Sequence, residues 1–254
     1  MQRYFLKLAY NGAAYHGWQI QPNAVSVQEV LEQALSALLK ASIAVVGCGR
    51  TDTGVHASVF FAHFETEIIF EPKSLVRKLN GFLRENIVIY DCFPVSDELH
   101  ARFSAEYRIY RYYVSTCKDP FRTQLSYQIF KNIDFDKMNQ AAKVLFDYID
   151  FSAFSKSHTQ TMTNNCKILR AEWVQSPNEH LWYFEIEADR FLRNMVRAIV
   201  GTLLEIGYGK LTVDAFREII ESKDRREAGV SVPAHALFLY DVGYPKEFLK
   251  DSSL

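Results

Sequence analysis

The chain has 254 residues, of which 48% are hydrophobic and 23% are charged, and its formal net charge is −1 at pH 7. This composition is typical of a globular protein with a sizeable core, and it excludes a low-complexity chain or one with an apolar run of membrane-spanning length. A near-neutral chain has no general attraction for nucleic acid, so an RNA-binding surface would have to come from locally clustered arginines.

The cysteines and the N-terminus both indicate an intracellular protein. The four cysteines are far apart and form no Cys-x-x-Cys pair, which argues against a zinc site or a disulfide framework. We therefore expect reduced, mostly buried thiols. Residues 1–8 alternate like a strand and are too short and polar for a signal peptide. From these features we expect a cytoplasmic location.

The first 90 residues alternate between strand and helix patterns. Residues 4–10 predict a strand that ends at the Asn11-Gly12 turn, and Ser26 and Glu29 form a capping box before a helix with one apolar face. The remaining expected elements are strands over 43–46, 59–66 and 87–90 and a helix over 72–83. This order predicts an α+β fold with helices on one side of a sheet.

The loop 47–57 lies between two of these expected strands and carries the most chemistry. It contains three glycines together with Arg50, Asp52 and His56. Glycine permits sharp turns and close approach of a ligand, and an arginine near Asp52 favours its ionised form. Polar, glycine-rich turns are also common between strands, so these residues leave a plain turn and a functional site both open. The loop fits neither nucleotide-binding glycine fingerprint.

An aromatic strand with interleaved arginines is expected over 107–114. Period-two alternation puts Arg108, Tyr110 and Tyr112 on one face and Arg111 and Tyr113 on the other. Aromatic rings beside arginines suit a stacked base with a phosphate nearby. Tyrosine also favours strands for packing reasons, so this pattern alone leaves both interpretations open.

The remaining residues predict a second sheet-and-helix unit. We expect helices over 134–146 and 212–221, strands over 166–175, 181–188 and 236–243, and a polar loop over 152–165 that is either a plain surface loop or an RNA contact. A helix expected over 191–206 would place Arg193 and Arg197 on one side, which costs stability unless an anion is supplied. The pattern predicts two domains, 1–104 and 105–254.

Three stretches resemble one family. Residues 49–56 read Gly-Arg-Thr-Asp-Thr-Gly-Val-His, which resembles the catalytic signature of the TruA family of tRNA pseudouridine synthases, whose commoner form has Ala in place of Thr53. The region 102–112 and the stretch 191–201 are also similar to that family. Two places depart from it, because Ala236 stands where many members have Gly, and 83–86 replaces a usual Leu-Pro.

The resemblance implies a fold and a reaction. The fold would be α+β, with two ferredoxin-like halves whose mainly antiparallel sheets meet around a central active-site cleft. The protein would be a homodimer that converts uridine to pseudouridine on the 3′ side of the anticodon arm of tRNA, with no metal and no nucleotide cofactor. In that reaction the C1′–N1 bond breaks, the uracil rotates, and C1′ rejoins at C5.

The resemblance also implies residue roles. Asp52 would be the catalytic carboxylate, attacking either C1′ or the uracil ring. Tyr110 would stack on the flipped uracil and help to remove the C5 proton. Arg197 would pair with Asp52, and Arg50 would enter the space that the flipped nucleotide leaves. The further substrate-binding residues would be His56, Arg102, Arg108 and Arg193.

Three other interpretations are weighed against this one. A non-enzymatic RNA-binding module would use the strand 107–113 and would need neither Asp52 nor its arginine. A phosphotransferase or hydrolase using Asp52 would need clustered carboxylates or a Walker pattern, and the sequence has neither. A different pseudouridine synthase family would share the aspartate but not the wording of its loop.

Overall fold

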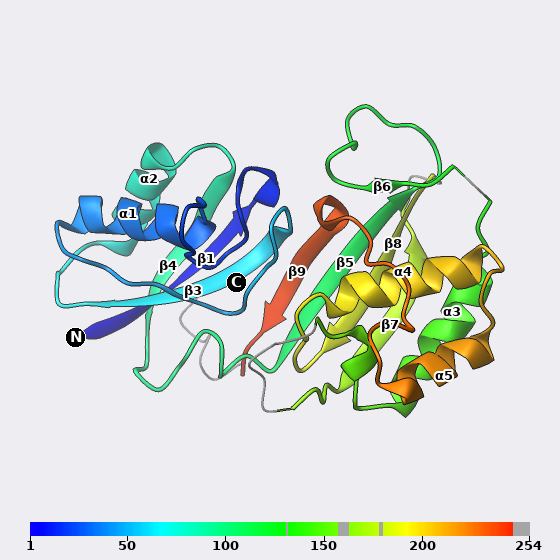
Figure 1. The fold of residues 1–254 in the computed structure, drawn as a ribbon. Helices are drawn as coiled ribbons and strands as arrows, with labels where there is room; N and C mark the ends of the chain where they lie inside the picture. The colour runs from blue at the N-terminus through cyan, green and yellow to red at the C-terminus, as the bar shows by residue number, and fades with distance from the viewer. Residues whose placement is uncertain (131, 157–162, 178–179, 246–254) are drawn as a thin grey trace. The chain divides into compact units, whose positions relative to one another are not determined.

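The computed structural model describes residues 1–130, 132–156, 163–177 and 180–245 (Figure 1). The chain forms two compact units, and each is described by itself. Unit 1 comprises Met1–Tyr107 with the segment that begins at Phe238, and unit 2 comprises Arg108–Leu237. The division into independently folding domains 1–104 and 105–254 stays a prediction.

The sheet of unit 1 is mainly antiparallel. Its strands are β1 (Gln2–Tyr10), β2 (Val46–Gly47), β3 (His56–Thr66), β4 (Ile87–Val95) and β9 (Leu237–Gly243). They lie in the order β4-β1-β3-β9, with β2 also paired to β3. β1 runs antiparallel to β3 and β4, and β2 runs antiparallel to β3, whereas β9 is parallel to β3.

Unit 1 has two α-helices, and the first has the N-cap that the sequence predicts. They are α1 (Val27–Leu39) and α2 (Pro72–Phe82), and a short 3-10 helix, η1, spans Gly12–Ala14. The Ser26 hydroxyl accepts a hydrogen bond from the Glu29 N–H at 3.2 Å, which satisfies one of the free donors at the start of α1. The buried positions of α1 recur at helical spacing, namely Val27, Leu31, Ala34, Leu35 and Leu39.

One predicted strand of unit 1 is mostly wrong. Residues 43–46 were expected to form a strand, but only Val46 joins the sheet, as part of β2. The Ile43 N–H donates to the Ser36 hydroxyl at 3.0 Å, and the Val45 N–H donates to the Glu32 carboxylate at 2.9 Å. Side chains of α1 therefore take the backbone donors that a strand would have given to the sheet.

Unit 2 packs three helices on one face of its sheet. The strands are β5 (Tyr107–Ser115), β6 (Tyr127–Gln128), β7 (Ile168–Gln175) and β8 (Leu181–Ala188), and β8 lies antiparallel between β5 and β7. The helices are α3 (Phe135–Val144), α4 (Met195–Gly207) and α5 (Val213–Ser222), with 3-10 turns η2 (Leu145–Asp147), η3 (Ser152–Phe154) and η4 (Ala234–Ala236). Figure 1 shows α3, α4 and α5 on the same side of these strands.

The two faces of β5 differ as the alternation predicts. Tyr112 and Val114 are fully buried on the helix-covered face. On the other face, Arg111 pairs with the buried Glu185 of β8 at 2.5 Å, and its guanidinium lies 4.4 Å from the centre of the Tyr183 ring. The second face of β5 is therefore occupied by protein contacts and not only by solvent.

The predicted helix over 191–206 starts later than expected. α4 begins at Met195, because its N-cap Asn194 adopts a left-handed conformation with φ of 67°. The Arg193 carbonyl accepts from the Lys156 N–H at 3.1 Å instead of from a residue of the helix. Arg193 and Arg197 therefore do not share one helical face, and the predicted like-charge repulsion at helical spacing does not apply.

The α+β class is confirmed, with mainly antiparallel pairing in each unit. No helix of the described residues is long and apolar enough to span a membrane. Part of the polar loop 152–165 forms η3, and its residues 157–162 lie outside the described residues, so its proposed RNA contact stays a prediction.

Candidate active site

Asp52 lies on a loop whose backbone is fixed on both sides of it. The Tyr10 and Thr51 hydroxyls share a hydrogen bond of 2.8 Å, and the Thr51 carbonyl accepts from the Trp18 N–H at 3.3 Å. The Asp52 carbonyl accepts from the Val55 N–H at 3.1 Å. Thr51 is buried while Asp52 is half-buried. The backbone from which the Asp52 carboxylate projects is thus held in place, which limits the cost of positioning that side chain.

A second loop, residues 11–18, supports the Asp52 loop through close backbone contacts. A Cβ added at Gly12 would lie 2.0 Å from the Val55 carbonyl oxygen, and one at Gly17 would lie 2.3 Å from the Thr51 carbonyl oxygen. Gly17 also has φ of +83°, a conformation that residues with a Cβ rarely adopt. Within the loop 47–57 itself, Gly54 has φ of 80°, whereas Gly49 has nothing within 4 Å of its Cβ position.

Aromatic side chains pack together beneath the two loops. The Trp18 ring is buried and stacks on Phe60 of β3 with centroids 4.1 Å apart, and Tyr10 packs on Phe60 at 5.5 Å. A Cβ at Gly47 would lie 2.5 Å from the Trp18 ring. Trp18 is therefore a packing residue that fills the space between the loop 11–18, Gly47 and β3.

His56 is buried within unit 1 and connects two of its loops. Its side chain is only 1% exposed, its ring stacks on Phe238 at 4.5 Å, and its Nδ1 accepts from the Gly12 N–H at 3.0 Å. An accepting Nδ1 puts the hydrogen of the neutral imidazole on Nε2. These contacts tie the end of the Asp52 loop to the loop 11–18. Direct contact between His56 and RNA stays a prediction.

Tyr110 projects from β5 in unit 2. Its ring meets Phe191 edge-on, with centroids 5.0 Å apart and the planes at 85°. Tyr110 is half-buried, whereas Tyr112, two residues along the same face, is fully buried. Arg108, also on that face, donates to the Asp189 carbonyl at 2.9 Å. Of Tyr110 and Tyr112 on this face, Tyr110 is thus the one that is not fully buried.

Arg197 is oriented by a backbone segment that wraps around α4. Its Nε donates to the Val232 carbonyl at 2.8 Å. A Cβ at Gly201 would lie 2.0 Å from the Val230 carbonyl oxygen, so this segment runs directly against the helix. The Gly229 N–H donates to the Thr202 hydroxyl at 2.9 Å, which adds a second attachment.

Arg225 holds the same segment from its other side. One terminal nitrogen of its guanidinium donates to the carbonyls of Ala228 and Gly229, each at 3.2 Å, and the other donates to the Ser231 hydroxyl at 2.8 Å. The Asn194 side-chain amide donates to the same hydroxyl at 2.6 Å. Nothing in the sequence singled out Arg225, because it lies outside every recognised motif.

The other predicted arginines lie at or near the surface. Arg50 is exposed next to Thr51 in the loop of unit 1, and Arg102 lies in a turn before β5. Arg193 is exposed just before α4 in unit 2. These positions are compatible with phosphate contacts, and each of those contacts stays a prediction.

Comparison with known proteins decides the family. A family model described as tRNA pseudouridine synthase matches residues 141–245. Proteins named tRNA pseudouridine synthase A from Parabacteroides distasonis, Bacteroides fragilis and Bacteroides thetaiotaomicron are 56%, 54% and 52% identical to this chain. The alignments cover 97%, 98% and 100% of this chain, and 98%, 99% and 94% of those proteins, respectively.

The chain belongs to the tRNA pseudouridine synthase A family. This membership confirms the resemblance that the residues 49–56 carry. The matched region 141–245 includes Arg193, Arg197 and Arg225, whereas Asp52 and Tyr110 are covered by the full-length relatives.

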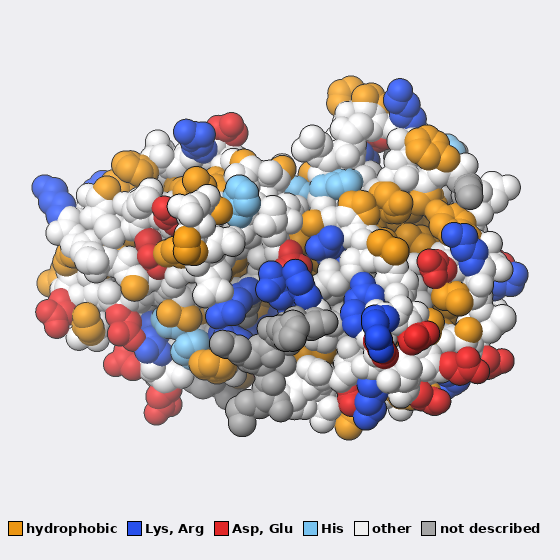
Figure 2. All heavy atoms as spheres, in the orientation of Figure 1, with side chains coloured by type: hydrophobic (Ala, Val, Ile, Leu, Met, Phe, Trp, Pro, Cys, Tyr) orange, Lys and Arg blue, Asp and Glu red, His pale blue; other side chains and the backbone are white. Residues whose placement is uncertain are grey.

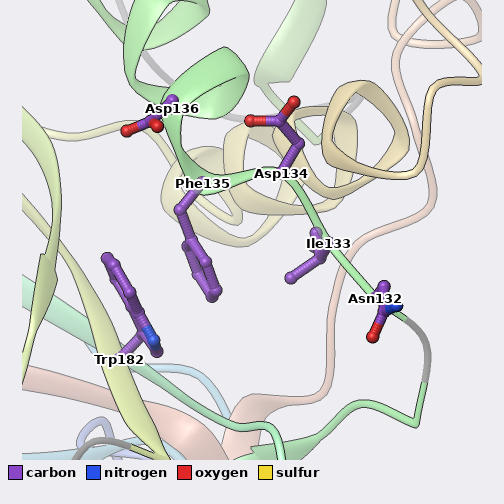
Figure 3. A pocket seen from close by; sticks show the side chains of 6 residues that line it. All are labelled: Asn132, Ile133, Asp134, Phe135, Asp136 and Trp182. Carbon is purple, nitrogen blue, oxygen red and sulfur yellow. The ribbon is translucent and has the colours of Figure 1, made fainter.

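Unit 2 has a pocket of about 530 Å³. It is lined by Asn132, Ile133, Asp134, Phe135, Asp136 and Trp182, none of them a predicted site residue. Figure 3 shows the Phe135 and Trp182 rings side by side, and their centroids are 3.8 Å apart at 7°. Asp134 caps α3 by accepting from the Lys137 N–H at 2.9 Å. Phe135, Trp182 and Asp134 therefore have structural roles at this pocket.

Hydrophobic side chains gather on the visible face of unit 2 around β6 and the start of α3 (Figure 2). Within the part of the chain that the structure describes, no three His, Cys, Asp or Glu side chains form a group that could hold a metal ion. The absence of a metal requirement stays a prediction.

Proposed function

We propose that this chain isomerises uridine to pseudouridine in tRNA, with Asp52 as the catalytic carboxylate. The observation that carries the proposal is the half-buried Asp52 on a loop whose backbone is fixed at Thr51 and Val55. The name of the full-length relatives supports the reaction and the tRNA substrate. A tRNA substrate also suits a cytoplasmic enzyme.

The reaction is an isomerisation, so every atom of the uracil is kept. The C1′–N1 bond breaks, the uracil turns, and a C1′–C5 bond forms; the C5 proton leaves, and N1 takes up a proton. Asp52 either forms a bond to C1′ as the uracil departs or adds to the uracil ring, and both routes remain open. In each case the carboxylate must be ionised and fixed before the bond changes.

Three side chains would complete the chemistry. Tyr110 would stack on the flipped uracil, because its ring is half-buried and oriented by Phe191. Arg197 would pair with the Asp52 carboxylate, since its Nε bond to Val232 fixes the plane of the guanidinium. Arg50 would fill the space that the flipped nucleotide leaves, because it is exposed beside the catalytic carboxylate.

The order of elements supports the ferredoxin-like part of the proposal. Unit 1 runs β1-α1-β2-β3-α2-β4 along the chain, with sheet order β4-β1-β3-β2, as in a β-α-β-β-α-β fold. Unit 2 runs β5-α3-β7-β8-α4, which matches the first five elements of the same pattern. A homodimer whose two subunits share one tRNA would reconcile the net charge of −1 with an RNA substrate. Light scattering of the purified protein tests that state.

Release of tritium from tRNA that carries 5-tritiated uridine tests the proposed reaction. We expect release by the parent and none by Asp52→Ala or the isosteric Asp52→Asn, with tRNA binding retained by both variants. A variant that keeps appreciable turnover would remove Asp52 from the chemistry. Tight tRNA binding without release by the parent would instead indicate an RNA-binding module.

A further inference from the structure

The turn formed by residues 100–104 is closed by its own hydrogen bonds. The Ser104 N–H donates to the His100 carbonyl at 3.0 Å, and the His100 N–H donates to the Ser104 hydroxyl at 3.0 Å. The His100 Nδ1 accepts from the backbone N–H groups of Arg102 and Phe103 at 3.0 and 3.2 Å. The Phe103 N–H is therefore bonded within a closed turn.

The same turn is attached to the core of unit 1. Ala101 is fully buried, its N–H donates to the His63 Nδ1 at 3.1 Å, and its carbonyl accepts from the Tyr244 hydroxyl at 2.5 Å. Just before the turn, the Arg3 guanidinium donates to the Leu99 carbonyl at 2.9 Å. Strands β1 and β3 thus hold the turn, and its outward side chains start from a rigid base.

This rigid base presents an aromatic ring to solvent. The Phe103 side chain is 76% exposed, although apolar rings of this size normally pack in a core. The His100 ring lies 4.4 Å from it with planes at 32°, and the Arg102 guanidinium lies over the Phe103 ring, 5.5 Å from its centre. An exposed aromatic ring with an arginine in contact offers a base a surface to stack on and a phosphate a cation to pair with.

Neither histidine adds charge to the turn near neutral pH. Burial, with Arg3 and His100 nearby, lowers the pKa of His63 to about 4, and burial also lowers the pKa of His100. The flat surface is then uncharged while Arg102 carries the positive charge. In the turn itself Phe103 is flanked by Arg102 and Ser104, so the apolar surface there is one ring and not a patch of the size that protein interfaces bury.

We propose that Phe103 is a stacking platform for an unstacked base of the bound RNA, with Arg102 beside it for the adjoining phosphate. This inference rests on the proposed function for the identity of the RNA, which is tRNA. It adds a base-binding residue to the arginines and to Tyr110, and it lies entirely within unit 1.

Equilibrium binding of tRNA to the full-length protein at fixed salt tests the platform. We expect Phe103→Ala to raise Kd roughly ten- to hundredfold, the range found when a stacking aromatic is truncated. Phe103→Tyr should stay close to the parent, because it keeps the ring. Phe82, 56% exposed at the end of α2, is the matched control, and Phe82→Ala should leave Kd unchanged.

Two further measurements separate stacking from a general loss of structure. Thermal unfolding of Phe103→Ala should match the parent, since the side chain is mostly exposed. In Phe103→Trp, tRNA should quench the added indole fluorescence through contact with a base. A parental Kd for Phe103→Ala, or no added quenching in Phe103→Trp, would overturn the platform.

The outcome for the platform is distinguishable from that for the reaction. Weakened binding by Phe103→Ala together with no tritium release by the parent would keep the platform and remove the proposed isomerase activity. Full tritium release by the parent with unchanged binding by Phe103→Ala would keep the proposed isomerase activity and remove the platform. Arg102→Ala should reduce the slope of log Kd against log salt by about one phosphate contact. An unchanged slope would remove Arg102 from the platform.

Discussion

The Arg197 side chain and the Val232 backbone are joined in both directions. The Arg197 Nε donates to the Val232 carbonyl at 2.8 Å, and the Val232 N–H donates back to the Arg197 carbonyl at 3.2 Å. The guanidinium plane is consequently set by a segment more than thirty residues away in sequence. Any residue that fixes this segment also fixes the arginine proposed to pair with the catalytic carboxylate.

Arg225 is expected to act on the reaction through that segment. Arg225→Ala removes the three hydrogen bonds to Ala228, Gly229 and Ser231. We expect kcat to fall about tenfold or more while the KM for tRNA changes little, because a small displacement of a catalytic group is costly. Steady-state tritium release measures both constants.

The neighbouring arginine supplies the control for this prediction. The Arg226 side chain is 87% exposed and pairs with Asp224, so Arg226→Ala should keep the parental kcat. Arg225→Lys keeps the charge but cannot reach all three acceptors, and it should resemble Arg225→Ala. A parental kcat in both Arg225 variants would show that the segment holds itself in place.

Arg193 and Arg197 show which features of a helix a sequence pattern predicts and which it does not. The sequence correctly predicted a helix in this region, and α4 spans Met195–Gly207. It could not reveal that the left-handed Asn194 delays the start of the helix until after Arg193, or that the Asn194 amide donates to the Ser231 hydroxyl. Local periodicity contains no information on a contact made across 37 residues.

The glycines near Asp52 show the same limit of sequence patterns. The wording of residues 49–56 was enough to find Asp52, but the glycines that let a second backbone approach this loop are Gly12 and Gly17 in another loop. Those two glycines look like ordinary turn residues in the sequence. Glycine is required at both positions because the Thr51 and Val55 carbonyls lie against them in the folded chain, where β1 is paired with β3.

Gly17→Ala should therefore damage both stability and activity. The added Cβ would lie 2.3 Å from the Thr51 carbonyl oxygen at φ of +83°. The left-handed conformation alone costs about 1–2 kcal/mol, and the clash adds to it. Urea unfolding should show a loss of at least about 2 kcal/mol, with reduced tritium release because the Asp52 loop must move. Gly81→Ala, in α2 with nothing within 4 Å of its Cβ, should instead be neutral or stabilising. Equal effects in the two variants would contradict this account.

The Tyr110 hydroxyl should matter to turnover more than to binding. Tyr110→Phe keeps the ring and its edge contact with Phe191, so the Kd for tRNA should stay near the parental value. We expect kcat to fall by about ten- to a hundredfold if the hydroxyl helps to remove the C5 proton. Tyr113→Phe, on the opposite face of the same strand and next to Tyr183, should keep the parental kcat. Equal rates for Tyr110→Phe and the parent would reduce the hydroxyl to packing.

The buried His63 should make stability depend on pH. Its pKa is lowered to about 4, first by burial and then by Arg3 and His100, while Glu65 acts in the opposite direction. An unfolded histidine titrates near pH 6.5, so between about pH 6.5 and pH 4 the unfolded chain binds more protons than the folded one. The free energy of unfolding therefore keeps its whole His63 contribution above that window. It falls as the pH drops through the window, by up to about 3 kcal/mol.

Urea unfolding at about pH 7.5 and about pH 5 measures this fall in the free energy of unfolding. The fall should be about 2 kcal/mol smaller in His63→Gln, which keeps an acceptor for the Ala101 N–H. Identical losses in the parent and the variant would mean that His63 does not carry this dependence.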